Sequence, residues 1–179
     1  MNKIFEVIEA QKIFSIDFNK IEIVIHPQSL VHAIIKYKNG LYKLLYFETD
    51  MAIPIGNVLF GKNFEIKKFK NIKNNKKSNF QNQLNFINVN ESKFPAIKLK
   101  PLLNKYASLP IVLNAANEIF VDQFIKKNIS FYSIINYLFV LLKDPKFRKY
   151  AIKRPSNLKT ILTLDKWTRS KAMEILKKK

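Results

Sequence analysis

The sequence contains no cysteine among its 179 residues, and this absence removes several classes of protein at once. Disulfide-stabilised scaffolds, zinc sites with cysteine ligands and thiol nucleophiles all require a side chain that the chain does not have. Only three glycines are present, Gly40, Gly56 and Gly61, and none lies in a glycine-rich phosphate loop. A dinucleotide-binding fold built on such a loop is therefore not expected in this chain.

Long apolar segments are also missing. The longest apolar stretch, residues 131–142, is interrupted by Ser133 and Asn136 and is too short to span a bilayer. The first residues lack the basic start, apolar core and cleavage site of a signal peptide. We therefore expect a cytoplasmic protein without a membrane partner. Its 47% content of hydrophobic residues is sufficient for a buried core.

Arginine is scarce although the chain is strongly basic. Lys and Arg together number 32 against 13 Asp and Glu, which gives a net charge of +19, but only residues 148, 154 and 169 are arginines. Surfaces that bind phosphates or base edges usually favour the bidentate arginine side chain. The abundance of Lys, Asn and Ile is typical of AT-rich coding sequences, so mutational drift is favoured over a selected polyanion-binding surface. No nucleic-acid partner is expected.

Changes in composition and periodicity predict an α+β protein in three segments. Residues 62–90 contain 7 Lys and 9 Asn without Gly or Pro, which is typical of a linker. Before this linker, the apolar spacing over residues 2–15 predicts a helix. Residues 21–26, 32–37 and 41–47 are predicted as strands of a small sheet that this helix covers, the last two joined in a hairpin at Asn39-Gly40. Such a thin layer leaves apolar strand surface that needs a partner chain or a further part of the domain.

After the linker, the pattern predicts a bundle of helices. The Leu109-Pro110 pair is expected to end a first helical element. Helices are predicted over residues 114–127, from an N-cap at Ser130, and from about residue 164 to residue 178. The resulting division is a partial catalytic domain over 1–61, a linker over 62–90 and a C-terminal helical domain over 91–179.

The start of the first helix carries the best candidate for chemistry. Asn2 and Glu6 are four residues apart and Lys3 and Glu6 are three apart, so all three side chains project from one side of the helix at its N-terminal end. Free backbone N–H groups, a lysine and an amide suit an anion, and a carboxylate suits Mg²⁺ or Mn²⁺ beside it. On spacing alone, however, a solvated ion pair between Lys3 and Glu6 is the more common arrangement.

Other reactive side chains do not form a recognisable site. His26 and His32 are not spaced as metal ligands, and a structural role as hydrogen-bonded histidines is favoured over metal binding. Ser29 is not in the glycine-rich elbow that exposes a nucleophilic serine.

Five segments together resemble one enzyme family in their order and approximate spacing. They are residues 2–10, which begin Asn2-Lys3-Ile4-Phe5-Glu6; residues 25–32, which contain His26-Pro27-Gln28-Ser29; residues 50–55; Phe94-Pro95-Ala96-Ile97-Lys98-Leu99; and residues 113–119, which contain Leu113-Asn114-Ala115-Ala116-Asn117-Glu118. The family is 1-deoxy-D-xylulose-5-phosphate reductoisomerase, and the resemblance covers nearly the whole chain.

The resemblance implies an activity and assigns residues to it. The family converts 1-deoxy-D-xylulose 5-phosphate to 2-C-methyl-D-erythritol 4-phosphate in non-mevalonate isoprenoid biosynthesis, by a metal-assisted rearrangement and hydride transfer from NADPH. It implies that Asn2, Lys3 and Glu6 bind the phosphorylated sugar, with Glu6 as the catalytic metal ligand for Mg²⁺ or Mn²⁺. Met51 falls near the family's substrate pocket, although a core position is equally open. The family also implies a homodimer.

Two departures from the family pattern concern local shape. Ile4 stands where the family has glycine, and Phe60-Gly61 replaces a Trp-Pro pair. The family's NADPH-binding domain and its other two carboxylate ligands precede the point where this chain begins, so we expect no cofactor-binding residue and no turnover in this chain alone.

Three origins remain open: a gene fragment re-started at an internal methionine after a frameshift, a split-gene product that assembles with a separate N-terminal chain, or a non-functional remnant. The alternative from another class is a basic RNA-associated or anionic-membrane-associated module that binds through residues 62–77.

Overall fold

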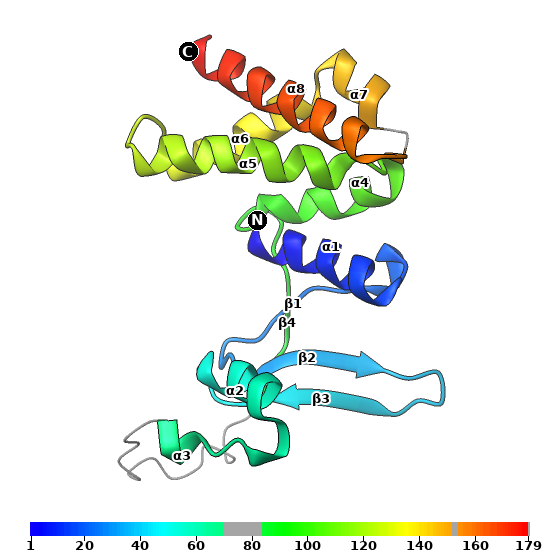
Figure 1. Cartoon of the computed structure of the whole chain (residues 1–179), viewed down its shortest axis with the longest axis vertical. Helices are drawn as coiled ribbons and strands as arrows, with labels where there is room; N and C mark the ends of the chain where they lie inside the picture. The colour runs from blue at the N-terminus through cyan, green and yellow to red at the C-terminus, as the bar shows by residue number, and fades with distance from the viewer. Residues whose placement is uncertain (70–83, 152–153, 179) are drawn as a thin grey trace. The chain divides into compact units, whose positions relative to one another are not determined.

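The computed structural model describes residues 1–69, 84–151 and 154–178, and the chain forms two compact units (Figure 1). The helical unit consists of Met1–Ile23 and Val89–Lys179, and the hairpin unit of Val24–Asn88. Helices and two small antiparallel sheets are both present, which confirms the predicted α+β class. Because the hairpin unit is inserted between two parts of the helical unit, the first helix and the C-terminal helices share one core.

The elements of the helical unit are six α-helices and two 3-10 turns among the described residues. They are α1 (Asn2–Phe14), η1 (Phe18–Lys20), η4 (Pro95–Leu99), α4 (Lys100–Lys105), α5 (Leu109–Ile125), α6 (Phe131–Leu142), α7 (Pro145–Ala151) and α8 (Leu158–Lys177). The described elements of the hairpin unit are β1 (Val24–Ile25), β2 (Val31–Lys36), β3 (Tyr42–Tyr46), α2 (Ala52–Phe60), η2 (Gly61–Asn63), α3 (Ile66–Phe69) and β4 (Ile87–Asn88).

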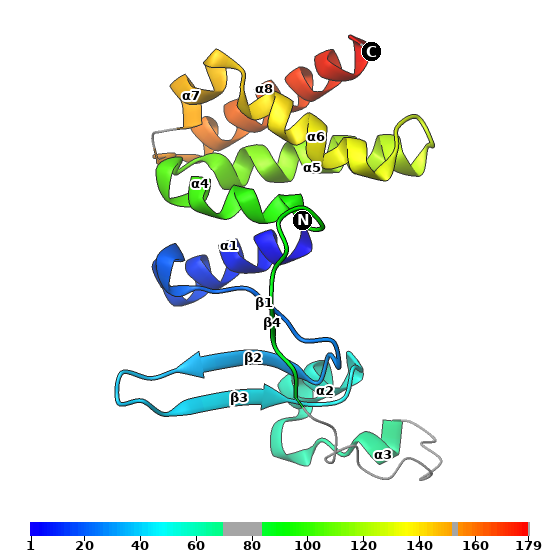
Figure 2. The same cartoon turned by 180° about the vertical axis from the view of Figure 1, so that it is seen from behind.

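Helix α5 is the centre of the helical unit and packs against both α6 and α8 (Figure 2). Ala115 and Ala116 of α5 are completely buried, and these small side chains allow neighbouring backbones to approach closely. Phe120 of the same helix is also fully buried and contacts the ring of Tyr137 on α6. Burial of this apolar stripe, more than intrinsic propensity, holds the bundle together.

Side chains at the helix starts explain where the C-terminal helices begin. Ser130 accepts a hydrogen bond from the N–H of Ser133 (3.3 Å), which confirms it as the N-cap of α6. The expected break at Leu109-Pro110 was wrong, because Pro110 lies in the first turn of α5. The backbone N–H that proline lacks would have no partner within the helix at this position. Helix α8 begins at Leu158, earlier than predicted, because Asn157 caps it through the N–H of Thr160 (2.9 Å).

The predicted hairpin is confirmed in the hairpin unit. Strands β2 and β3 pair antiparallel with Ile34 opposite Leu44, and Gly40 adopts a positive φ of 87° in the connecting turn. The predicted third strand does not join this sheet. Its residues Val24 and Ile25 form β1, which pairs with β4 of the segment predicted as a linker. A two-residue strand at the entry to the unit pairs with the strand at its exit, a long-range pairing that local patterns do not reveal.

The apolar side of α1 is buried in its own unit. Ile4 and Val7 belong to the core formed with Leu99 and Leu103, whereas the sequence predicted that this helix covers the sheet. The segment 62–90 carries η2 and α3 at one end and β4 at the other, and its residues 70–83 lie outside the described part of the chain. The division into 1–61, 62–90 and 91–179 stays a prediction.

Among the described helices, none combines the length and the apolar character needed to cross a bilayer.

Candidate substrate and metal site

The three side chains predicted to form a site converge at the N-terminal end of α1. Lys3 Nζ donates to Glu6 Oε2 at 2.6 Å, and Asn2 Nδ2 donates to Glu6 Oε1 at 3.3 Å. The Lys3 and Glu6 side chains are 64% and 45% exposed, so a ligand can reach them. The helical spacing predicted from the sequence therefore brings the amide, the ammonium and the carboxylate together on one solvent-facing surface.

In this arrangement the carboxylate of Glu6 joins the cluster. Each of its two oxygens accepts one hydrogen bond, Oε1 from Asn2 and Oε2 from Lys3. A cation that binds Glu6 would compete with the Lys3 ammonium, which would then be available to a phosphate together with the N–H groups of the helix start. The same geometry is also that of a solvated ion pair, so the assignment of Asn2, Lys3 and Glu6 stays a prediction.

Glu6 is the only carboxylate in the cluster. Within the described ranges, no group of three or more His, Asp or Glu side chains is arranged to hold a metal ion. Mg²⁺ and Mn²⁺ prefer several oxygen ligands. Glu6 therefore suits one position in a metal site, and a complete site needs ligands from outside this cluster.

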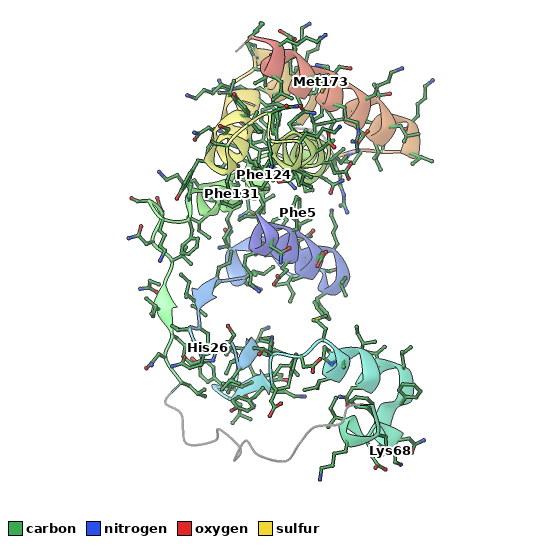
Figure 3. All side chains as sticks on the ribbon, turned by 90° about the vertical axis from the view of Figure 1, so that its left-hand side faces the viewer. Phe5, His26, Lys68, Phe124, Phe131 and Met173 are labelled. Carbon is green, nitrogen blue, oxygen red and sulfur yellow. The ribbon has the colours of Figure 1, made fainter. Side chains whose placement is uncertain are left out.

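The two histidines have structural partners in the hairpin unit. His26, which is labelled in Figure 3, donates from Nδ1 to the carbonyl oxygen of Asn85 (2.9 Å). Its ring stacks on the ring of Phe86. His32 Nε2 donates to the carbonyl oxygen of Phe47 (3.1 Å), and these two rings also stack. These contacts agree with the structural role predicted for both side chains.

The structure also places Met51 and Ser29, two further residues considered from the sequence. Met51 is 70% exposed, so it is not a core methionine in this structure. Ser29 has a positive φ of 54° and its N–H donates to the carbonyl of His26, which places it in a tight turn.

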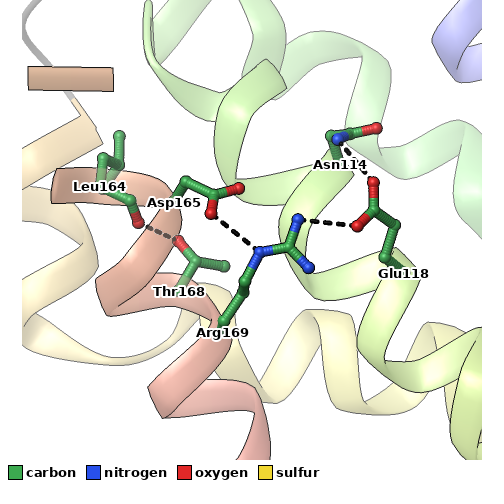
Figure 4. Close-up of polar contacts among 6 residues, drawn as sticks. All are labelled: Asn114, Glu118, Leu164, Asp165, Thr168 and Arg169. Atoms are coloured by element: carbon green, nitrogen blue, oxygen red, sulfur yellow. Dashed lines mark hydrogen bonds and ion pairs between the residues drawn. The ribbon is translucent and has the colours of Figure 1, made fainter. Parts of the chain in front are cut away.

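The Asn-Ala-Ala-Asn-Glu motif forms a polar connection between α5 and α8 (Figure 4). Asn114 donates to Glu118 (3.2 Å), and Arg169 of α8 donates to Glu118 (2.7 Å) and to Asp165 (2.8 Å). Both carboxylates raise the pKa of Arg169, with Asp165 the larger cause. The sequence indicated Glu118 but not its partner, since 51 residues separate them.

A second ion pair, which the sequence reasoning missed, joins the start of α7 to α8. Lys171 Nζ lies 2.9 Å from Asp144 Oδ2, and the two side chains are only 22% and 14% exposed. Asp144 Oδ1 also accepts from the N–H of Lys146 at 2.8 Å. The hydrogen bond from Lys171, with a smaller contribution from this N–H, holds the pKa of Asp144 below its ordinary value.

Comparison with known proteins gives one consistent result. A family model described as "DXP reductoisomerase C-terminal domain" matches residues 48–171. The 1-deoxy-D-xylulose 5-phosphate reductoisomerase of Pelagibacter ubique (strain HTCC1062) is 38% identical over 166 residues, covering 92% of this chain and 42% of that protein. The enzyme of the same name from Wolbachia sp. subsp. Brugia malayi (strain TRS) is 36% identical over 182 residues, covering 100% of this chain and 44% of the relative.

Solved structures agree with these relatives. A DOX-P reductoisomerase in complex with NADPH, fosmidomycin and magnesium superposes with a TM-score of 0.85 and 28% identity, over 98% of this chain and 43% of that one. The enzyme from Zymomonas mobilis in complex with NADPH gives a TM-score of 0.74 and 29% identity, over 98% of this chain and 44% of that one.

The fold of this chain is thus similar to that of the C-terminal portion of a reductoisomerase. The chain spans less than half the length of the relatives that it matches. It belongs to the DXP reductoisomerase family, whose C-terminal domain it contains.

Proposed function

We propose that this chain provides the substrate-binding helix and the C-terminal helical domain of an NADPH-dependent 1-deoxy-D-xylulose-5-phosphate reductoisomerase. The observation that carries the proposal is the convergence of Asn2, Lys3 and Glu6 on one exposed side of the N-terminal end of α1. The product of the complete reaction is 2-C-methyl-D-erythritol 4-phosphate, an intermediate of non-mevalonate isoprenoid biosynthesis.

Each of the three side chains has a role that its chemistry suits. Lys3 and Asn2 bind oxygens of the phosphorylated sugar, and the N–H groups of the helix start favour the same negative charge. Glu6 provides one hard oxygen ligand for Mg²⁺ or Mn²⁺. The metal, when bound, acts as a Lewis acid on the substrate carbonyl.

We infer that the remaining parts of the active site lie outside residues 1–179. Residues 1–179 contain no glycine-rich phosphate loop for NADPH. Among the residues that the structure describes, no group of metal-ligating side chains surrounds Glu6, and Glu6 alone is too few ligands for the metal. A separate N-terminal chain that carries the NADPH-binding domain would complete the site. In the complete enzyme, a homodimer would cover the exposed apolar side chains of the hairpin and its turn, such as Ile35, Leu41 and Leu45.

A joined enzyme tests the proposal. Residues 1–179 are fused behind the preceding part of the Pelagibacter ubique relative, and NADPH oxidation is followed with 1-deoxy-D-xylulose 5-phosphate and Mg²⁺. We expect turnover by the joined enzyme and none by the chain alone. Glu6→Gln should lower kcat/KM by about a hundredfold, the scale of losing a transition-state electrostatic contact.

Glu9→Gln is the matched control, because Glu9 is an exposed glutamate one turn further along the same helix. It should leave kcat/KM close to that of the joined enzyme. Equal activity of the Glu6→Gln and Glu9→Gln variants would contradict the assignment of Glu6.

A further inference from the structure

The segment Phe94–Leu99 has no role in the proposed chemistry, yet it is one of the segments by which the chain resembles its family. In the structure, residues Pro95–Leu99 form the 3-10 turn η4, and α1 packs against this turn. Leu99 is completely buried in the core of the helical unit. A segment distant in sequence therefore forms part of the surface against which the helix with the candidate site packs.

Helix α1 has little to stabilise it apart from this packing against η4 and the core. It is 13 residues long, and its N-terminal end has neither a side-chain cap nor an acidic residue in the first turn. Isolated helices of this length are marginally stable in water. The helical state of its first turn therefore depends on burial of its apolar side.

The buried residues of α1 are direct neighbours of the site residues. Ile4 follows Lys3 and is 2% exposed, and Val7 follows Glu6 and is 4% exposed. Phe5 lies between them on the helix and packs against the same core (Figure 3). An α-helix has 3.6 residues per turn, so consecutive side chains point about 100° apart around its axis. Burial of Ile4 and Val7 in the core therefore also sets the directions of Lys3 and Glu6.

A second contact lies just after the C-terminal end of α1. Asn104 of α4 donates to Asn19 of η1 at 2.6 Å, and η1 lies shortly after the end of α1. The helix is thus held at the start by the buried core and beyond its end by a polar contact, both from residues of the C-terminal part of the helical unit.

We propose that Leu99, through Ile4 and Val7, is a positioning residue that orients Asn2, Lys3 and Glu6 toward substrate and metal. This inference rests on the proposed function for its catalytic consequence. It assigns the Phe94–Leu99 segment a task in the reaction: the C-terminal domain holds the substrate-binding helix in place.

Hydrogen exchange on the full chain tests whether packing against Leu99 stabilises α1. Leu99→Ala is compared with Leu138→Ala, a matched deletion, because Leu138 is equally buried in the same core but lies on α6, which packs against α5, α7 and α8. We expect the amides of residues 4–11 to exchange about tenfold faster in Leu99→Ala than in Leu138→Ala, with the amides of α8 as reference. Equal exchange in α1 would overturn the proposal. If either alanine variant does not fold, Leu99→Val and Leu138→Val give the same comparison with a smaller deletion.

Kinetics of the joined enzyme test the consequence for the site. Leu99→Ala should raise the KM for Mg²⁺ by about tenfold, the scale seen when support for a metal ligand is lost, and Leu99→Met should restore it. Leu138→Ala should change this KM by less than about twofold, since it acts on a distant contact. Equal effects of the two alanine substitutions would overturn the positioning role. Glu6→Gln reports separately on the proposed function: if it has no effect there, that function fails, while hydrogen exchange still decides whether Leu99 orders α1.

Discussion

Replacing Asp144 separates two contributions to the stability of the helical unit. One carboxylate oxygen pairs with Lys171 of α8 at 2.9 Å, and the other accepts the N–H of Lys146 at 2.8 Å in the first turn of α7. Loss of a cap costs about 1 kcal/mol and loss of a half-buried ion pair about 1 kcal/mol. Asp144→Ala should therefore lower the free energy of unfolding by about 2 kcal/mol.

The amide variant isolates the charge. In Asp144→Asn the side-chain oxygen can still accept from Lys146, so only the ion pair is lost and the expected decrease is about 1 kcal/mol. Urea denaturation of the two variants, followed by far-UV circular dichroism, measures both values. Asp122→Asn is the control, because Asp122 forms a more exposed pair with Lys126, and its effect should be smaller. Equal losses in Asp144→Ala and Asp144→Asn would refute the cap contribution.

The pH dependence of the same variant has a definite sign. The pKa of Asp144 is lowered in the folded chain, chiefly by Lys171, so its contribution is present above the unfolded pKa and is lost as pH falls through the folded one. The stability difference between the parent and Asp144→Asn should therefore be constant near neutral pH and shrink below about pH 4, the ordinary range of an aspartate. A difference that persists unchanged at pH 2 would contradict this assignment.

Three further predictions concern other contacts. A Cβ on Gly56 would overlap the ring of Phe64, so Gly56→Ala should destabilise the hairpin unit, and limited proteolysis should cleave that unit faster. A double-mutant cycle of Glu118→Gln and Arg169→Met should give a coupling of about 0.5 kcal/mol in urea denaturation, and additive effects would contradict the pair. Ala116 is completely buried on α5, so Ala116→Leu should lower the unfolding free energy by about 1–3 kcal/mol, measured in the same way.

The sequence predicted best those features that depend on neighbours a few residues apart. The site cluster at Asn2, Lys3 and Glu6, the cap at Ser130 and the turn at Gly40 all follow from local spacing or turn chemistry. Such features are decided within one or two turns of chain, so periodicity and side-chain type are sufficient to predict them.

Features that depend on distant residues were not predictable in the same way. Strand β1 needs β4, more than 60 residues later, and Arg169 needs Glu118 on another helix. Pro110 shows a different limit. A proline can mark the end of one helix or the first turn of another, and only the structure shows that Pro110 lies in the first turn of α5.

The hairpin unit retains a large apolar surface that its own residues do not cover. Leu41 and Leu45 of the hairpin region are 64% and 56% exposed, and Val58 and Leu59 of α2 are 85% and 69% exposed. A two-stranded hairpin of this kind is marginally stable in water by itself. The helical unit also exposes apolar side chains, such as Ile125 and Leu158, but it contains the buried apolar core as well. Stability in this chain is therefore concentrated in the unit that holds α1, and the hairpin unit is the part whose folding is expected to depend most on the contacts proposed for the complete enzyme.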